Sequence, residues 1–421
     1  MNIRGFSRTF ASLSIYNYRL FWMGQVVSLT GTWMQTIAQA WLVLDLTNSP
    51  FALGVVSMLQ FLPVTVFGLL GGVIADRLPK RKILLTTQTL SAFQALVLAT
   101  LVLSDSVELW HVYLLALMLG TGSAVEFPTR HSFVIEMVGR EQLTNAVALN
   151  SMVFNSARIV GPMVAGITIS AVGVGGAFLL NAVSFLGTLS ALALMRPSEL
   201  HSAPRTEGGG HVLRHLGEGI HYALSRREIV VIIITLGTIG LFGYNFNAML
   251  ALIARFILDS DPVGFGSLTS AMGAGSLLGA LSIAYARHAS RKTLFAAAAS
   301  FSVLLVAIGL SNWYMVTIAL LVMWGVAAIM LTMSANTQLQ LLVPDEMRGR
   351  VMSMYILLIA GSTPIGSLII GAMASRIDVG VTIVIMGLLC LAGTTAGLLY
   401  SRRPQKDYEE QPLQTAAPSA P

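Results

Sequence analysis

Charged residues inside long apolar stretches are the first candidates for chemistry in this sequence. Glu126 and Arg130 stand one helical turn apart in one stretch, and Arg158 stands in the next. A charge inside a membrane-spanning helix is costly and is by default a functional candidate. Among the 19 acids, Glu126 alone lies well within such a stretch, so it is the candidate for coupling to protons. The alternative is an ion pair in which Glu126 and Arg130 simply neutralise each other.

Arg158 is expected to lie too far along its helix to form a simple bridge with Glu126. Two roles are open for its guanidinium. It could bind an anionic group of a substrate, or it could hydrogen-bond to carbonyls that Pro162 leaves without their usual donor.

Uncharged polar residues recur in other apolar stretches. At intervals of three and four stand Gln25, Ser28, Thr32, Gln35 and Gln39, and later stretches hold Asn245 and Asn336. We expect these amides to face a cavity, where neighbouring Trp33, Trp41 and Phe61 would suit a bulky amphiphile. The alternative is hydrogen bonding between helices.

The composition requires that these residues be positioned in a bilayer. Of 421 residues, 55% are hydrophobic and only 10% are charged, whereas a soluble domain carries about 25% charge. A single soluble globule is therefore excluded. The one cysteine, Cys390, excludes an intrachain disulfide framework. The net charge of +6 comes from short basic clusters between apolar runs, so we expect no nucleic-acid partner.

The apolar runs predict an all-α polytopic membrane protein with 12 transmembrane helices in two pseudo-symmetric six-helix bundles. The predicted spans are 19–45, 52–75, 83–103, 110–134, 143–170, 177–195, 229–255, 264–285, 293–311, 313–341, 351–375 and 379–400. The domains are then 1–195 and 229–400, joined by a central loop, 196–228, and followed by a disordered tail, 401–421.

Loop charges predict the orientation. One side of the predicted spans holds 22 of the 25 Lys and Arg residues, so this side, with both termini and the central loop, is expected to be cytoplasmic. The central loop contains an amphipathic stretch from Val212 to Leu224, which we expect to lie at the membrane interface. His211 and His215 could share a helical face, but no cysteine or acidic cluster completes a ligand set, so we predict no metal site.

The two halves share an internal repeat. A shift of 205 positions superposes Gly120 on Gly325 and Glu141 on Glu346, and it also superposes Gly161 on Gly366 and Gly166 on Gly371. Inverted or parallel repeats around a central site are typical of transporters that work by rocking of the two halves.

The loop after the second predicted span carries a recognisable motif. It reads Gly72-Val-Ile-Ala-Asp76-Arg77-Leu-Pro79-Lys80-Arg81-Lys82 and resembles the loop between helices 2 and 3 of the major facilitator superfamily. The resemblance implies a gating role for Gly72, Asp76, Arg77, Lys80 and Arg81, which would support the outward-open state. The helix that begins near Val351 would accept the contact. Pro79 stands where many members have glycine.

A second motif lies in the fifth predicted span. Gly161, Pro162 and Gly166 resemble the glycine-proline motif that is associated with exporters of this superfamily, although packing of small residues explains the glycines equally well. Asn155-Ser156-Ala157-Arg158, Phe127-Pro128-Thr129-Arg130 and the segment 344–351 are similar to the bacterial enterobactin-exporter-like branch. This likeness covers nearly all of residues 12–400.

The resemblance implies a secondary active transporter of a bacterial cytoplasmic membrane that exports a small amphiphile, drug or siderophore-like, by proton antiport. No cofactor is expected, and the chain is expected to work as a monomer. The alternatives are an importer of the same fold and a lysophospholipid flippase. We predict no enzymatic activity, because no nucleophile with a base and no metal-ligand set stands at the interface.

Overall fold

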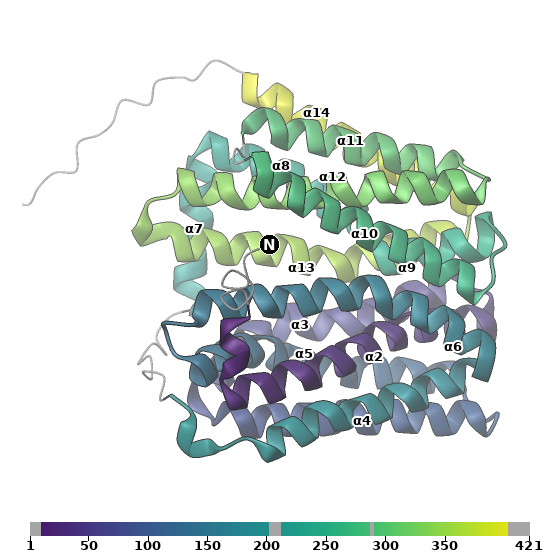
Figure 1. Cartoon of the computed structure of the whole chain (residues 1–421). Coiled ribbons are helices and arrows are strands. Elements are labelled where there is room, and N and C mark those ends of the chain that lie inside the picture. Colours follow the sequence, from purple (N-terminus) through teal and green to yellow (C-terminus); the bar gives the residue numbers. More distant parts are fainter. Residues whose placement is uncertain (1–9, 202–211, 287–289, 403–421) are drawn as a thin grey trace, which may run out of the picture.

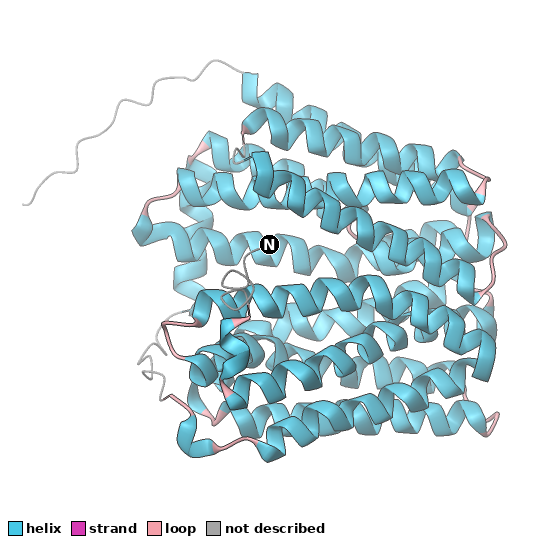
Figure 2. Cartoon of the chain, viewed as in Figure 1, coloured by secondary structure: helices cyan, strands magenta, loops and turns pink. Residues whose placement is uncertain are grey.

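The computed structural model describes residues 10–201, 212–286 and 290–402, in which all regular secondary structure is helical (Figure 2). The long helices are α2 (Tyr16–Thr47), α3 (Pro50–Arg77), α4 (Lys80–Leu103), α5 (Leu109–Val138), α6 (Leu143–Leu194), α8 (Arg227–Phe242), α10 (Pro262–Ala286), α11 (Arg291–Leu310), α12 (Tyr314–Leu342), α13 (Asp345–Ala374) and α14 (Val379–Arg402). The short ones are η1 (Ala11–Ser14), η2 (Pro197–Glu199), α7 (Val212–Ser225), α9 (Phe246–Leu252) and the π-helical turn η3 (Ile253–Ile257).

Within the described residues, eight helices are long and apolar enough to cross a membrane, or nine if α8 with α9 and η3 forms one bent span. This confirms an all-α polytopic chain. The amphipathic stretch of the central loop forms α7, which packs against α8 and α13. His211 and the tail from residue 403 lie outside the described residues.

Helix α6 consists of two antiparallel arms. At 52 residues and 1.5 Å per residue it would be about 78 Å long, against a hydrocarbon core of about 30 Å. Gly173 breaks it with φ of 75°, a conformation that glycine adopts without steric cost. The first arm runs parallel to α2, and the Tyr18 hydroxyl donates to the Ala146 carbonyl. The second arm returns along α2, with Gln25 bonded to Thr188.

The predicted continuous helix 229–255 is wrong in detail. The structure breaks it after Phe242 into α8, α9 and η3. The Asn245 side chain donates to the Leu241 carbonyl at 2.9 Å and so satisfies an acceptor that the break leaves free. The Tyr244 hydroxyl bonds to the Ala328 carbonyl of α12 at 2.8 Å, which holds the break in place.

The helices pack in two groups (Figure 1). Helices α2–α6, the N-terminal group, contact mainly one another, and helices α8–α14, the C-terminal group, do the same. Two pairs of helices make most of the contact between the groups, α3 with α13 and α6 with α10. We call the end that holds Phe10 and Arg402 the near end, and the end that holds Asn48 and Gly173 the far end.

The two groups meet at the far end. A Cβ atom added to Gly54 of α3 would lie 2.5 Å from the Ser367 carbonyl of α13, and one added to Gly166 of α6 would lie 2.6 Å from the Pro262 carbonyl of α10. The largest buried apolar cluster combines side chains from both groups there, including Trp41 and Phe265. Backbones approach this closely only where glycine leaves room.

The groups part toward the near end. Added Cβ atoms on Gly68, Gly72 and Gly349 would meet no described atom within 4 Å. The near-end core of the N-terminal group, with Tyr18 and Phe133, is a separate cluster drawn from that group alone. The hydrogen bonds and close glycine contacts between the groups therefore reach from the far end to the middle of the helices, where Thr65 of α3 donates to the Ala360 carbonyl of α13, and none is found closer to the near end among the described residues.

Candidate functional site

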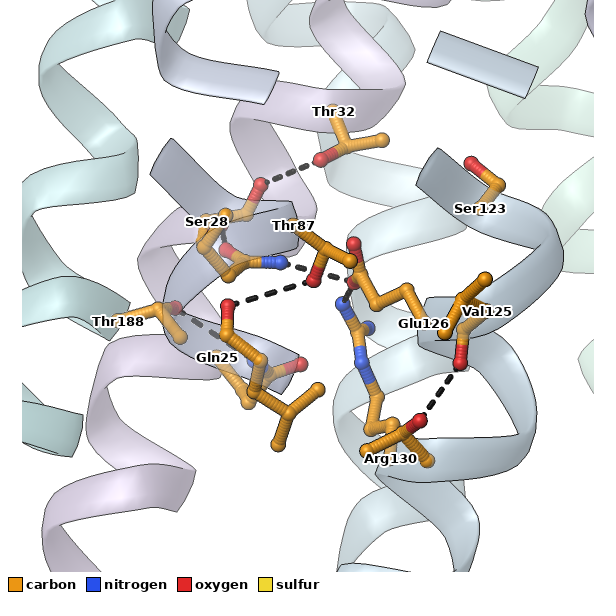
Figure 3. Close-up of polar contacts among 12 residues, drawn as sticks. Gln25, Ser28, Thr32, Thr87, Ser123, Val125, Glu126, Arg130 and Thr188 are labelled. Atoms are coloured by element: carbon orange, nitrogen blue, oxygen red, sulfur yellow. Dashed lines mark hydrogen bonds and ion pairs between the residues drawn. The ribbon is translucent and has the colours of Figure 1, made fainter. Parts of the chain in front are cut away.

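Glu126 forms the centre of a buried polar cluster in the N-terminal group (Figure 3). Glu126 lies in α5 and is only 7% exposed. One of its carboxylate oxygens, Oε1, forms an ion pair with Arg130 Nη2 one turn along the helix. Gln88 of α4 donates to the same oxygen through Nε2 at 2.8 Å. The predicted pair is therefore present, and an amide from a second helix completes it.

One further contact links this cluster to α2, because the Ser28 hydroxyl donates to Gln88 Oε1 at 3.5 Å. A neighbouring contact joins α2 to α6, in which Gln25 Nε2 donates to the Thr188 hydroxyl at 3.5 Å. Arg130 Nε is buried without a hydrogen-bond partner among the described residues. Glu126 therefore joins α5 to α4 through Gln88, and Ser28 extends the cluster to α2.

Gln88 is a residue that the sequence reasoning missed. The signal was present, because Thr87, Gln88, Ser91 and Gln94 form a polar stripe on α4. All four are buried. A polar stripe on one helix indicates a partner stripe on another.

The α2 stripe faces α4 and α6. Gln35 donates to Gln94 at 2.8 Å and accepts from Asn181 Nδ2 of the second α6 arm. Gln39 is buried, and its Nε2 has no partner among the described residues. Gln35 thus joins helices within the N-terminal group, which is the packing alternative for this stripe.

The two asparagines of the C-terminal group lie at different places. Asn245 is buried at the α8–α9 break, where Ser367 of α13 donates to its Oδ1 at 3.4 Å. Asn336 of α12 is partly exposed and accepts from Gln340 at 2.6 Å. Asn245 therefore supports the broken helix, whereas Asn336 lies toward the near end of α12.

Arg158 lies where the two groups touch. The carbonyl of the next residue, Ile159, accepts a hydrogen bond from Ser270 of α10 at 2.6 Å. The Arg158 side chain is partly buried. The structure thus separates Arg158 from the Glu126 cluster and brings it close to the opposite group.

The loop motif between α3 and α4 divides into two parts. Lys80 pairs with Glu136 of α5 at 2.6 Å, and Arg81 donates to the Leu192 and Ala193 carbonyls that end α6. Asp76 and Arg77, by contrast, are exposed. No hydrogen bond or ion pair of the Asp76 carboxylate is found among the described residues, so the expected contact with α13 is not formed in this conformation.

The glycine-proline motif lies at helix contacts. An added Cβ on Gly161 would lie 2.5 Å from Trp33 Cβ of α2, and the Pro162 carbonyl contacts Gly266 of α10. Gly166 approaches the start of α10 as described above. The motif therefore packs α6 against α2 on one side and against the C-terminal group on the other.

Comparison with protein families accounts for this architecture. Residues 7–419 match a family model described as transmembrane secretion effector, a family of the major facilitator superfamily. The chain belongs to this family. It is therefore a membrane transporter and not an enzyme, and the resemblance inferred from the motifs is confirmed.

Relatives and solved structures agree with this assignment. The chain is 25% identical to the multidrug efflux pump Tap of Mycolicibacterium fortuitum over 88% of its length and 92% of the relative. It is 23% identical to the enterobactin exporter EntS of Shigella boydii over 89% of its length and 91% of the relative. A solved bacterial homologue of the human lysosomal transporter Spinster is 13% identical with a TM-score of 0.71, covering 92% of this chain and 96% of that one, and shows a shared fold.

Proposed function

We propose that this transporter exports a small amphiphilic molecule from the bacterial cytoplasm by alternating access. Its 12 spans would form two six-helix bundles, 1–195 and 229–400. The observation that carries the proposal is the asymmetry of contact between the groups, whose hydrogen bonds and close glycine contacts lie between the far end and the middle of the described helices. Two groups that touch at one end only can rock about the contact and open the other end.

The near end is proposed to be cytoplasmic, because 22 of the 25 Lys and Arg residues lie on the side of both termini. The described conformation would then be inward-open and ready to receive substrate from the cytoplasm. Export is favoured by the relatives, whose names describe a multidrug efflux pump and an enterobactin exporter.

Coupling to protons is assigned to Glu126. It is the acid in the described spans that is buried and held by groups from two helices, Arg130 on α5 and Gln88 on α4. Protonation would free Arg130 and weaken the link between α5 and α4. Asp76 is assigned a later step, in which the near end closes and its carboxylate meets the N-terminal end of α13, where backbone N–H groups favour an anion.

Transport into inverted membrane vesicles with an acid interior tests this proposal. We expect the wild-type chain to accumulate a fluorescent amphiphile, and Glu126→Gln to lose proton-driven accumulation while still exchanging substrate in counterflow. Glu141→Gln, which alters an exposed acid, serves as the matched control. Accumulation by Glu126→Gln at the wild-type rate would refute the coupling role, and accumulation only in right-side-out vesicles would show an importer.

A further inference from the structure

Arg158 is a cation at the group interface with no acidic partner among the described residues. The ion pairs of the described chain join Lys80 to Glu136, Arg130 to Glu126, Arg196 to Glu199 and Arg348 to Asp345. Glu126, the other ionisable centre of the N-terminal spans, is thus already neutralised by its own neighbour. A guanidinium at this depth without a counter-charge is unfavourable unless something supplies the charge.

The position of Arg158 is at the inner edge of the far-end contact. The Ser270 hydroxyl holds the adjacent Ile159 carbonyl, and the Arg158 carbonyl would lie 3.2 Å from a Cβ added to Gly273 of α10. One turn toward the near end on α6, Phe154 is 42% exposed and meets Trp33 of α2 edge-on, with centroids 6.1 Å apart. An aromatic surface therefore lies beside the cation on the side where the groups part.

In the C-terminal group, Tyr244 lies at the break between α8 and α9. Its hydroxyl is held by the Ala328 carbonyl at 2.8 Å and the Thr332 hydroxyl at 2.5 Å. Its ring stacks on Phe301 with centroids 5.6 Å apart. A ligand bound to Arg158 would lie beside the contact between α6 and α10, where the two groups meet.

We infer that Arg158 binds an acidic group of the transported molecule, a carboxylate, phosphate or phenolate, while the Trp33–Phe154 surface takes its apolar part. This inference rests on the proposed function and narrows its substrate to acidic amphiphiles. The guanidinium fork matches two oxygens of such an anion, and the anion supplies the missing counter-charge. Because α6 packs against α10 of the opposite group at Arg158 and Ile159, the bound anion would lie at the contact between the groups.

Binding of a matched pair of probes tests the inference. The full chain in nanodiscs of zwitterionic lipid is titrated with dansylaminoundecanoic acid and with its primary amide, and energy transfer from tryptophan reports binding. We expect the acid to bind about tenfold or more tightly than the amide, as for a hydrogen-bonded charge. Arg158→Gln should abolish this preference, Arg158→Lys should keep only part of it because lysine retains the charge but not the fork, and Arg376→Gln, which removes an exposed cation, should leave it unchanged.

Each outcome has a distinct meaning. Equal binding of both probes by the wild-type chain, or an unchanged preference in Arg158→Gln, would overturn the acidic-substrate inference and leave amphiphile export standing. Failure to bind either probe would overturn the proposed function and the inference with it. Weaker binding of the acid by the wild-type chain in discs that contain anionic lipid, with no such weakening in Arg158→Gln, would identify a lipid headgroup as an anion that Arg158 binds. The unfolding temperature of Arg158→Gln and Arg158→Lys, measured in the same discs, verifies that both variants are folded.

Discussion

The indole of Trp41 in α2 stacks on the ring of Phe265 in α10, with centroids 6.3 Å apart and planes inclined by 27°. Arg255 of η3 lies over the same indole, 5.7 Å from its centroid. Trp41 belongs to the N-terminal group, and both partners belong to the C-terminal group. A single side chain therefore joins the two groups at the far end through a stacked ring and a cation.

Trp41→Ala should weaken closure of the far end. An aromatic pair contributes about 0.5–1.5 kcal/mol and a cation–π contact about 0.5–2 kcal/mol, so the closed far end should lose about 1–3 kcal/mol. Double electron–electron resonance between labels at Phe51→Cys and Met315→Cys, in a Cys390→Ala background, would show a larger far-end population with long distances. Trp110→Ala, which removes an exposed far-end tryptophan, should leave the distribution unchanged. The same distribution of label distances in Trp41→Ala and wild type would show that the contacts of Trp41 with Phe265 and Arg255 do not stabilise the closed far end.

Gly166→Ala should act at the same end by a different route. The added Cβ would lie 2.6 Å from the Pro262 carbonyl, so α6 and α10 must separate, at a cost of about 1–3 kcal/mol. The Phe51–Met315 label distance should lengthen and transport should fall. Gly122→Ala is the control, because its Cβ would lie 3.8 Å from the nearest side chain and fits without movement. Equal effects of the two substitutions would show that the α6–α10 contact does not limit opening.

Gln88→Leu should weaken proton coupling without preventing substrate exchange. It removes the amide that donates to Glu126 at 2.8 Å, and hydrogen bonds to charged groups contribute about 1.5–3 kcal/mol. We expect roughly tenfold slower proton-driven accumulation with counterflow preserved. Gln94→Leu alters another amide of α4 and removes the acceptor of the hydrogen bond from Gln35 of α2. It should lower the unfolding temperature about as much as Gln88→Leu does but leave proton coupling intact. If both variants couple equally well, the Glu126 cluster is only a packing element.

Asp76→Asn should impair the transport cycle while leaving the unfolding temperature unchanged. Its carboxylate is exposed and has no described partner in this conformation, so the free energy of unfolding should change by less than about 0.5 kcal/mol. During turnover, labels at Glu141→Cys and Leu341→Cys should report less closure of the near end than in wild type. Asp105→Asn, an exposed acid at the far end, is the control. Wild-type transport by Asp76→Asn would exclude a gating contact.

The sequence anticipated the helices well because their signals are local. Runs of apolar residues about 20 long predict membrane helices directly, and most described helices lie within a few residues of the expected ranges. The break after Phe242 was not anticipated, because its stabilising bonds come from Tyr244 to α12 and from Asn245 to Leu241. A hydropathy profile contains no information about such hydrogen bonds.

The candidate site was anticipated in part for a similar reason. The Glu126–Arg130 pair follows from spacing within one helix, but Gln88 enters from α4, and no local pattern specifies which helix face meets another. The polar stripe on α2 likewise does not reveal which helices it contacts. Its period was evident in the sequence, whereas its partners, Gln94 and Asn181, depend on how α2, α4 and α6 pack.

By itself, the sequence indicated that this chain is an all-helical membrane transporter, predicted that its basic residues concentrate on one side, and identified the few ionisable residues within its predicted spans. Composition and periodicity carry this information because the bilayer acts on each segment separately. Only the tertiary structure decided that Gln88 joins the Glu126–Arg130 pair, that Arg158 has no acidic partner among the described residues, and that the contacts between the groups lie between the far end and the middle of the helices. These properties depend on distances between residues far apart in the chain, which are set by packing of whole helices.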